Sequence, residues 1–244
     1  MSQSRKNLKS RLILAIAVTL LVPLSFYLVA KILKKDHIQM PRYYVTERID
    51  TRVEDGKTVR DTVFHQLSDL KLINQMGQEV AISSELKDRI LVINFFFTSC
   101  PSVCPKLTSN MKMIQRAFRK DPKREEGMEN KVHLISITVN PERDSPRLLR
   151  AYADRFGVNH DHWWFLTGDK KKIYDFARHE LGLSVGDGNG GADDFIHSEK
   201  IIIVDRERFI RGYYDGLDTA SIAKCAYDIS LLTMEKKRKK KSSQ

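Results

Sequence analysis

The feature that most constrains the fold is an apolar run from Ile90 to Phe97, which only Asn94 interrupts. Such a run predicts a strand buried on both faces of a mainly parallel sheet, so its end lies at the carboxyl edge of that sheet. Cys100 and Cys104 follow directly, and apolar residues then recur at helical spacing, which predicts a helix over 105–119 that begins with a proline. Two thiols therefore lie where a buried strand gives way to a helix.

This placement predicts reactive thiols, with Cys104 at about the N-cap of the helix. Unpaired N–H groups at a helix start stabilise an anion, lower the pKa of a nearby thiol and make a thiolate available near neutral pH. Two thiolates can bind a soft metal or close a disulfide. A structural disulfide or two buried thiols are the alternatives, but a bridge across so short a loop removes little chain entropy. The third cysteine, Cys225, lies on the apolar face of a predicted helix and is expected to be a core residue.

The N-terminal part of the chain contains a candidate membrane segment. Residues 12–30 are 19 residues without a charge, bracketed by Lys and Arg, and this length is sufficient to cross a bilayer as a helix. No small-residue cleavage site followed by polar sequence is evident, so we expect an uncleaved signal anchor preceded by a cytoplasmic basic segment, 1–11. A long buried core helix is the alternative.

The net charge of +11 is concentrated at the two ends of the chain. Residues 1–35 carry seven Lys or Arg and no acidic residue, and 236–241 add six more, which leaves 29 basic and 31 acidic residues elsewhere. This distribution fits an anionic membrane surface, or solvated flanks, better than a nucleic-acid-binding face. We therefore expect the membrane but no nucleic acid as a partner, and a basic disordered tail over 235–244.

Between these ends the sequence predicts one α/β domain. Residues 31–61 are polar and are expected to be a tether, and the domain over 62–234 is expected to begin with a hairpin of 64–73 and 79–82. Strands then alternate with helices, and the chain finishes in a hairpin and a helix, which predicts a three-layer sheet. The elements expected after the thiol helix are strand 132–139, a helix opened by Ser145-Pro146, strand 163–166, helix 170–181, strands 200–204 and 209–213, and helix 219–232.

A soft metal held by two thiolates needs a further donor, and imidazole is the usual one. Of the seven histidines, His197 alone follows a glycine-rich stretch, 182–194, and precedes an apolar strand. A long loop at that position lets the side chain turn toward a neighbouring strand end. Asp193 and Asp194 are either supporting partners or solvated loop charges. The candidate metal ligands are therefore the two thiols and His197.

Three pieces of sequence are together typical of one known family. They are the turn Cys100-Pro101-Ser102-Val103-Cys104-Pro105, the segment Pro141-Glu142-Arg143-Asp144, and His197 opening a strand ahead of Asp205 and Gly212. On these residues the chain resembles the Sco/SenC family of membrane-anchored copper proteins, over roughly residues 62–232. The family usually has Asp where this chain has Asn140, so no charged role is expected at that position.

The resemblance implies a thioredoxin-like fold and one copper ion, Cu(I) or also Cu(II), bound by Cys100, Cys104 and His197. It implies delivery of copper, or thiol reduction, for assembly of the dicopper centre of cytochrome c oxidase. The implied partners are subunit II of that oxidase or another copper-accepting protein, and a thiol reductant protein. The implied location is the inner (cytoplasmic) membrane of a bacterium, with the domain in the periplasm.

Two enzymes with the same fold are the alternatives. A thiol-disulfide oxidoreductase would use Cys100 and Cys104 as a redox-active disulfide, and a thiol peroxidase would need only one of the two thiols. Redox-active thioredoxins, however, have a two-residue spacer between their cysteines, whereas this chain has three residues there.

Overall fold

The structure is a computed structural model that describes residues 16, 18–29, 40–54, 57–119, 128–183 and 199–235. The chain divides into two units, Met1–Gln39 and Met40–Gln244. In the first unit, residues 18–29 form a helix with exposed side chains. Within the described ranges, no helix combines the length and the apolar character that crossing a membrane requires. The anchor expected over 12–30 and the tail expected over 235–244 extend beyond the described residues.

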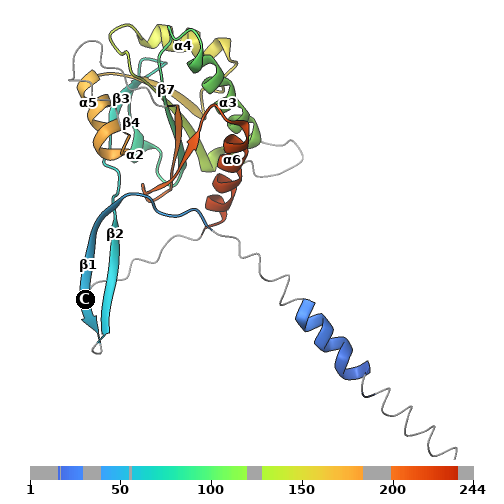
Figure 1. The fold of residues 1–244 in the computed structure, drawn as a ribbon. Helices are drawn as coiled ribbons and strands as arrows, with labels where there is room; N and C mark the ends of the chain where they lie inside the picture. Colours follow the sequence, from blue (N-terminus) through green and yellow to red (C-terminus); the bar gives the residue numbers. More distant parts are fainter. Residues whose placement is uncertain are drawn as a thin grey trace, which may run out of the picture. The chain divides into compact units, whose positions relative to one another are not determined.

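The second unit is built on a seven-stranded sheet in the order β4-β3-β7-β6-β5-β8-β9 (Figure 1). The strands are β3 (Lys71–Asn74), β4 (Glu79–Ala81), β5 (Ile90–Phe96), β6 (Val132–Thr138), β7 (Trp163–Thr167), β8 (Lys200–Val204) and β9 (Ile210–Asp215). β5, β6 and β7 are parallel, whereas the β3–β4 hairpin and the β8–β9 hairpin join them through antiparallel pairs. The predicted buried strand is confirmed as the central strand β5.

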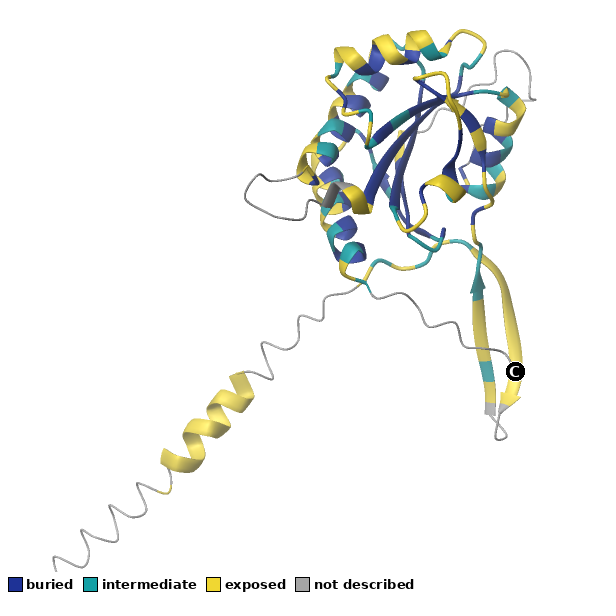
Figure 2. Cartoon of the chain, turned by 180° about the vertical axis from the view of Figure 1, so that it is seen from behind, coloured by how far each residue is buried: buried dark blue, intermediate teal, exposed yellow. Residues whose placement is uncertain are grey.

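Helices cover both faces of this sheet, so the predicted three-layer arrangement is confirmed (Figures 1 and 2). The helical elements are α2 (Ile82–Glu85), α3 (Val103–Ala117), η1 (Met128–Lys131), α4 (Pro146–Arg155), α5 (Lys170–Asp175), the π-helical turn η2 (Phe176–Glu180) that continues α5, and α6 (Thr219–Met234). α3, α4 and α6 pack on one face, and α5 with η2 packs on the other. All residues of β5 and β6 are buried, and Cys225 on α6 is a core residue as predicted.

A second, two-stranded sheet was not predicted. β1 (Thr46–Glu54) pairs antiparallel with β2 (Lys57–Phe64) in the stretch where the sequence predicted a tether over 31–61. Neither face of this hairpin is apolar, because Thr51 and Val53 on one face of β1 pair with Arg60 and Thr58 of β2, and Val53 remains 72% exposed. Periodicity detects a strand by its buried face, and this hairpin has none. The first arm of the predicted hairpin, 64–73, is likewise shorter in the structure, because β3 begins at Lys71.

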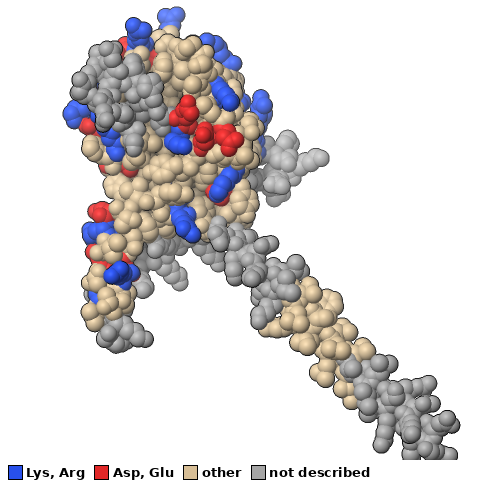
Figure 3. Space-filling view, viewed as in Figure 1, with Lys and Arg blue, Asp and Glu red and all other residues tan. Residues whose placement is uncertain are grey.

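Charges of both signs are interspersed on the described surface of the face drawn in Figure 3. This mixture agrees with the near balance of basic and acidic residues in the chain between its two basic ends.

The turn after β9 approaches α3 closely at Gly216. The N–H of Gly216 donates to the carbonyl of Glu199 at 2.8 Å, and its own carbonyl accepts the side-chain N–H of Asn110 on α3 at 2.7 Å. A Cβ at this position would lie 2.6 Å from the Glu199 carbonyl oxygen and 2.1 Å from a methyl carbon of Leu107. Only glycine therefore fits between the thiol helix and the start of β8.

We expect Gly216→Ala to lower the free energy of unfolding by about 2 kcal/mol, because a backbone carbonyl and a packed leucine must both shift. Thr219→Ala, at the exposed first residue of α6, is the control and is expected to change stability by less than about 0.5 kcal/mol. Urea denaturation of the purified protein measures both. Equal stability of the two variants would contradict the tight approach.

Candidate functional site

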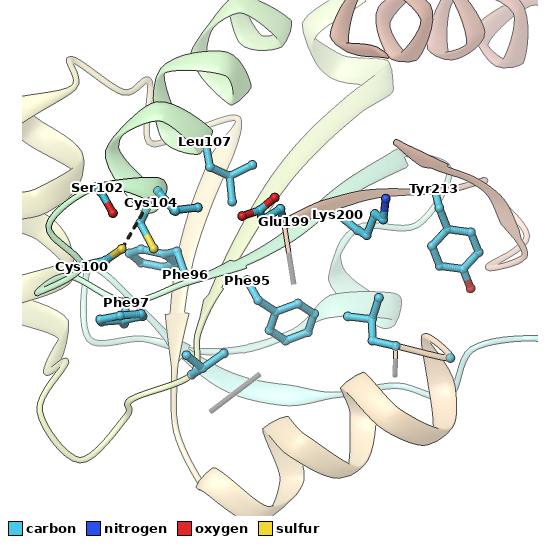
Figure 4. A pocket seen from close by; sticks show the side chains of 14 residues that line it. Phe95, Phe96, Phe97, Cys100, Ser102, Cys104, Leu107, Glu199, Lys200 and Tyr213 are labelled. Carbon is cyan, nitrogen blue, oxygen red and sulfur yellow. Dashed lines mark hydrogen bonds between the residues drawn. The ribbon is translucent and has the colours of Figure 1, made fainter. Parts of the chain in front are cut away.

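The carboxyl end of β5 leads into a loop that carries the first thiol. α3 begins at Val103 with Ser102 in the N-cap position, two residues earlier than predicted, so Cys104 is the second helical residue. The Ser102 side chain makes no capping hydrogen bond. The N–H of Cys104 instead donates to the sulfur of Cys100 at 3.3 Å (Figure 4). The outer thiol thus acts as an acceptor at the helix start.

The two thiols have different environments. Burial acts against ionisation of Cys100, but hydrogen bonds from the N–H and the thiol of Cys104, and from the N–H groups of Ser102 and Val103, outweigh it and lower its pKa. Cys104 is only 6% exposed, and burial, its hydrogen bond to Cys100 and the nearby negative charges of Cys100 and Asp144 raise its pKa to about 12. The sequence predicted a lowered pKa for both thiols. That prediction was wrong for Cys104, because its side chain belongs to the apolar core.

Both thiols line a cavity of about 720 Å³ (Figure 4). In Figure 4 they lie at one side of it and Tyr213 at the other, with Glu199 and Lys200 between them. Most of the remaining lining side chains are apolar: Phe95, Phe96, Phe97, Val103, Leu107, Val139 and Leu183. Leu183 and Glu199, the described residues on either side of segment 184–198, both line the cavity.

The third predicted ligand, His197, lies outside the described residues, as do Asp193 and Asp194. None of the histidines that the structure describes lines the thiol cavity. In the same described ranges, His, Cys, Asp and Glu side chains form no group of three that could hold a metal ion. The described part of the site therefore contains two of the three predicted ligands, Cys100 and Cys104.

The buried carboxylate of Asp144, the last residue of the segment Pro141-Glu142-Arg143-Asp144, joins the thiol loop to the neighbouring strand, and this contact was not predicted. Asp144 is fully buried and accepts the N–H of Thr98 at 3.0 Å, together with the hydroxyls of Thr98 and Thr138. Thr98 follows β5, and Thr138 is the last residue of β6. The sequence does show a threonine near the end of each of two buried strands. Only the folded structure shows that both threonines bind the same carboxylate.

Residues 61–230 match the family model described as SCO1/SenC. A relative named SCO1 protein homolog, from Bacillus subtilis (strain 168), is 28% identical over 165 residues, which are 67% of this chain and 80% of that protein. The solved structure of BsSco, described as a member of the Sco family of cytochrome c oxidase assembly proteins with a disulfide switch, is 27% identical with a TM-score of 0.58. That match covers 70% of this chain and 95% of BsSco. The structure of Bradyrhizobium japonicum ScoI with copper bound is 25% identical with a TM-score of 0.53, over 68% of this chain and 99% of that one.

In the reduced protein, we expect iodoacetamide to modify Cys100 first, because the thiolate is the reactive form. Its reaction rate should rise from acid pH and level off above the pKa of Cys100, which the hydrogen bonds from the start of α3 lower from the ordinary thiol value. Cys104 and Cys225 should react slowly, because burial raises the pKa of both and covers them. Mass spectrometry of peptides labelled between about pH 5 and pH 9 measures these rates. Modification of Cys104 before Cys100 would contradict the prediction that Cys100 is the more reactive thiol.

Proposed function

Because the chain belongs to the SCO1/SenC family and has its thioredoxin-like fold, we propose that it is a membrane-anchored protein that binds one copper ion and transfers it to a copper-accepting protein. The proposed ligands are Cys100, Cys104 and His197, and the proposed recipient is cytochrome c oxidase through its subunit II. The observation that carries this proposal is the cavity that the two thiols share with Glu199, which follows His197 by two residues.

Chain connectivity supports His197 as the third ligand. Two residues span at most about 7 Å, so the Cα of residue 197 stays within that distance of the Cα of Glu199. Glu199 is itself tied to α3, the helix that carries Cys104, through Gly216 and Asn110. A ligand placed just before Glu199 therefore starts from a fixed point on the rim of the thiol cavity.

The donor set suits monovalent copper. Thiolate sulfur is a soft ligand, and two thiolates with one neutral imidazole favour Cu(I) over harder cations. Three donors leave room for a ligand of the recipient to approach. Cys100 is the more exposed of the two thiols, so an incoming ligand reaches it first, whereas Cys104 holds the ion from the core side. Such an arrangement allows transfer without prior release of the ion into solvent.

A thiol-disulfide oxidoreductase is the second candidate, and the asymmetry of the thiols supports it. An accessible thiol of lowered pKa, Cys100, can attack a disulfide of a partner, and Cys104 can then resolve the mixed disulfide. The two functions can coexist, because copper loading needs both thiols reduced. Their dependence on His197 separates them, since thiol exchange does not need an imidazole ligand.

Anaerobic titration of the reduced full-length protein is expected to show one tightly bound Cu(I) per chain. His197→Ala should weaken binding by at least about tenfold, in the range expected for loss of groups that shape a metal site. His179→Ala, which removes an exposed histidine from η2, is the matched control and should leave the affinity unchanged. Unchanged affinity in His197→Ala would reject the three-ligand site. Rapid reduction of protein disulfides that persists in that variant would favour the oxidoreductase.

We also propose that residues 12–30 anchor the chain in the inner membrane, with the domain in the periplasm. The exposed apolar side chains of helix 18–29, such as Phe26 at 75%, support a lipid environment. The full-length protein is expected to stay in the membrane pellet after carbonate extraction, and a chain that starts at Met40 should be released. A periplasmic reporter fused after the domain should be active. Release of the full-length chain would contradict the anchor.

A further inference from the structure

The carboxylate of Asp144 is the most unusual group beside the thiols. Its partners among the described residues are three neutral donors, the N–H and hydroxyl of Thr98 and the hydroxyl of Thr138. A buried carboxylate is costly unless such donors satisfy it. The carboxylate therefore keeps these three donors close to it. The donors belong to two segments of the chain, the loop after β5 and the end of β6.

The residue that carries this carboxylate is fixed by its own backbone. The N–H of Asp144 donates to the carbonyl of Asn140 at 2.9 Å, which closes the turn after β6. The next residue, Ser145, caps α4 by accepting the N–H of Leu148 on its side chain. Asp144 is thus held between the end of β6 and the start of α4, two elements packed in the core.

Through Thr98, this fixed carboxylate holds the loop that carries Cys100. Thr98 precedes Cys100 by two residues, and the N–H of Cys100 donates to the carbonyl of Phe97 at 3.3 Å, so the loop turns tightly between them. Along this path, the sulfur of Cys100 accepts the N–H of Cys104 at 3.3 Å. The loop position therefore sets where the sulfur of Cys100 lies relative to α3.

We propose that Asp144 is a positioning residue for the copper site, which fixes the Cys100 sulfur against the start of α3 by holding Thr98 to the end of β6. This inference rests on the proposed function, because it assigns a supporting residue to the same pair of thiols. Asp144 does not contact the ion in this scheme. It preserves the spacing of the two sulfurs that a bound ion requires.

The direction in which Asp144→Asn changes copper affinity separates this role from a simple effect of charge. Asp144→Asn keeps the shape of the side chain but replaces a charged carboxylate by one neutral oxygen and an NH2 group, so its hydrogen bonds to Thr98 and Thr138 weaken and the loop is held less firmly. A role through charge alone predicts tighter copper binding in this variant, because removal of a nearby negative charge favours formation of thiolates. A positioning role predicts weaker binding.

The experiment measures Cu(I) affinity of the reduced full-length protein by competition with a chromophoric chelator. We expect Asp144→Asn and Thr98→Val to bind about tenfold more weakly, the effect typical of losing an outer-shell partner, and Thr98→Ser to restore binding because it retains the hydroxyl. Asp205→Asn is the matched control. Asp205 is also a buried turn carboxylate, which accepts the N–H groups of Glu207 and Phe209 and pairs with Arg211 at 2.9 Å.

Asp205 follows β8 at the end opposite Lys200, which lines the cavity, so its variant should lose stability without losing copper affinity. Wild-type affinity in both Asp144→Asn and Thr98→Val, or tighter binding in Asp144→Asn, would overturn the positioning role. Absence of tight copper binding in the wild type would instead reject the proposed function.

The alkylation rate of Cys100 then still tests the positioning role without copper. This rate should fall in Thr98→Val and recover in Thr98→Ser. Equal rates in the wild type and in Thr98→Val would overturn the positioning role.

Discussion

The arrangement of the site depends on one constraint, the burial of β5 on both faces and its hydrogen bonding on both sides. With β6 and β8 as neighbours, β5 can deliver the chain to the surface only at the carboxyl edge of the sheet. The loop that follows is short, and α3 must then pack back onto the sheet. Cys100 is consequently placed in the loop before α3, and Cys104, the second residue of that helix, belongs to the apolar core.

The same parallel pairing brings the supporting groups together. β5 and β6 end at the same edge, so Thr98 and Thr138 can share the carboxylate of Asp144. Elsewhere on the cavity lining, Gly216 donates to Glu199 and accepts from Asn110, which ties the start of β8 to α3. These two ties hold the thiol loop and the start of α3 in place, while Cys100 remains partly exposed. The copper site that we propose would need both properties.

Most of the regular structure could be predicted from the sequence, because the central strands and the amphipathic helices have a buried face that leaves a periodic pattern. The β1–β2 hairpin could not, since its side chains face solvent on both sides and Val53 remains largely exposed. The raised pKa of Cys104 was also missed. A helix start predicts donors for an anion, but only the direction of the side chain decides whether a thiol meets those donors or the apolar core.

The sequence by itself determined the buried strand, the thiol pair at its end, the family resemblance and the charge distribution, because local pattern and spacing carry all four. Only the tertiary structure decided that the two thiols differ, that Asp144 joins two strand ends, and that Leu183 and Glu199 both line the thiol cavity. The physical reason is that burial and long-range hydrogen bonds depend on which segments the sheet places side by side. Residues far apart in the chain show no such relation until they are packed.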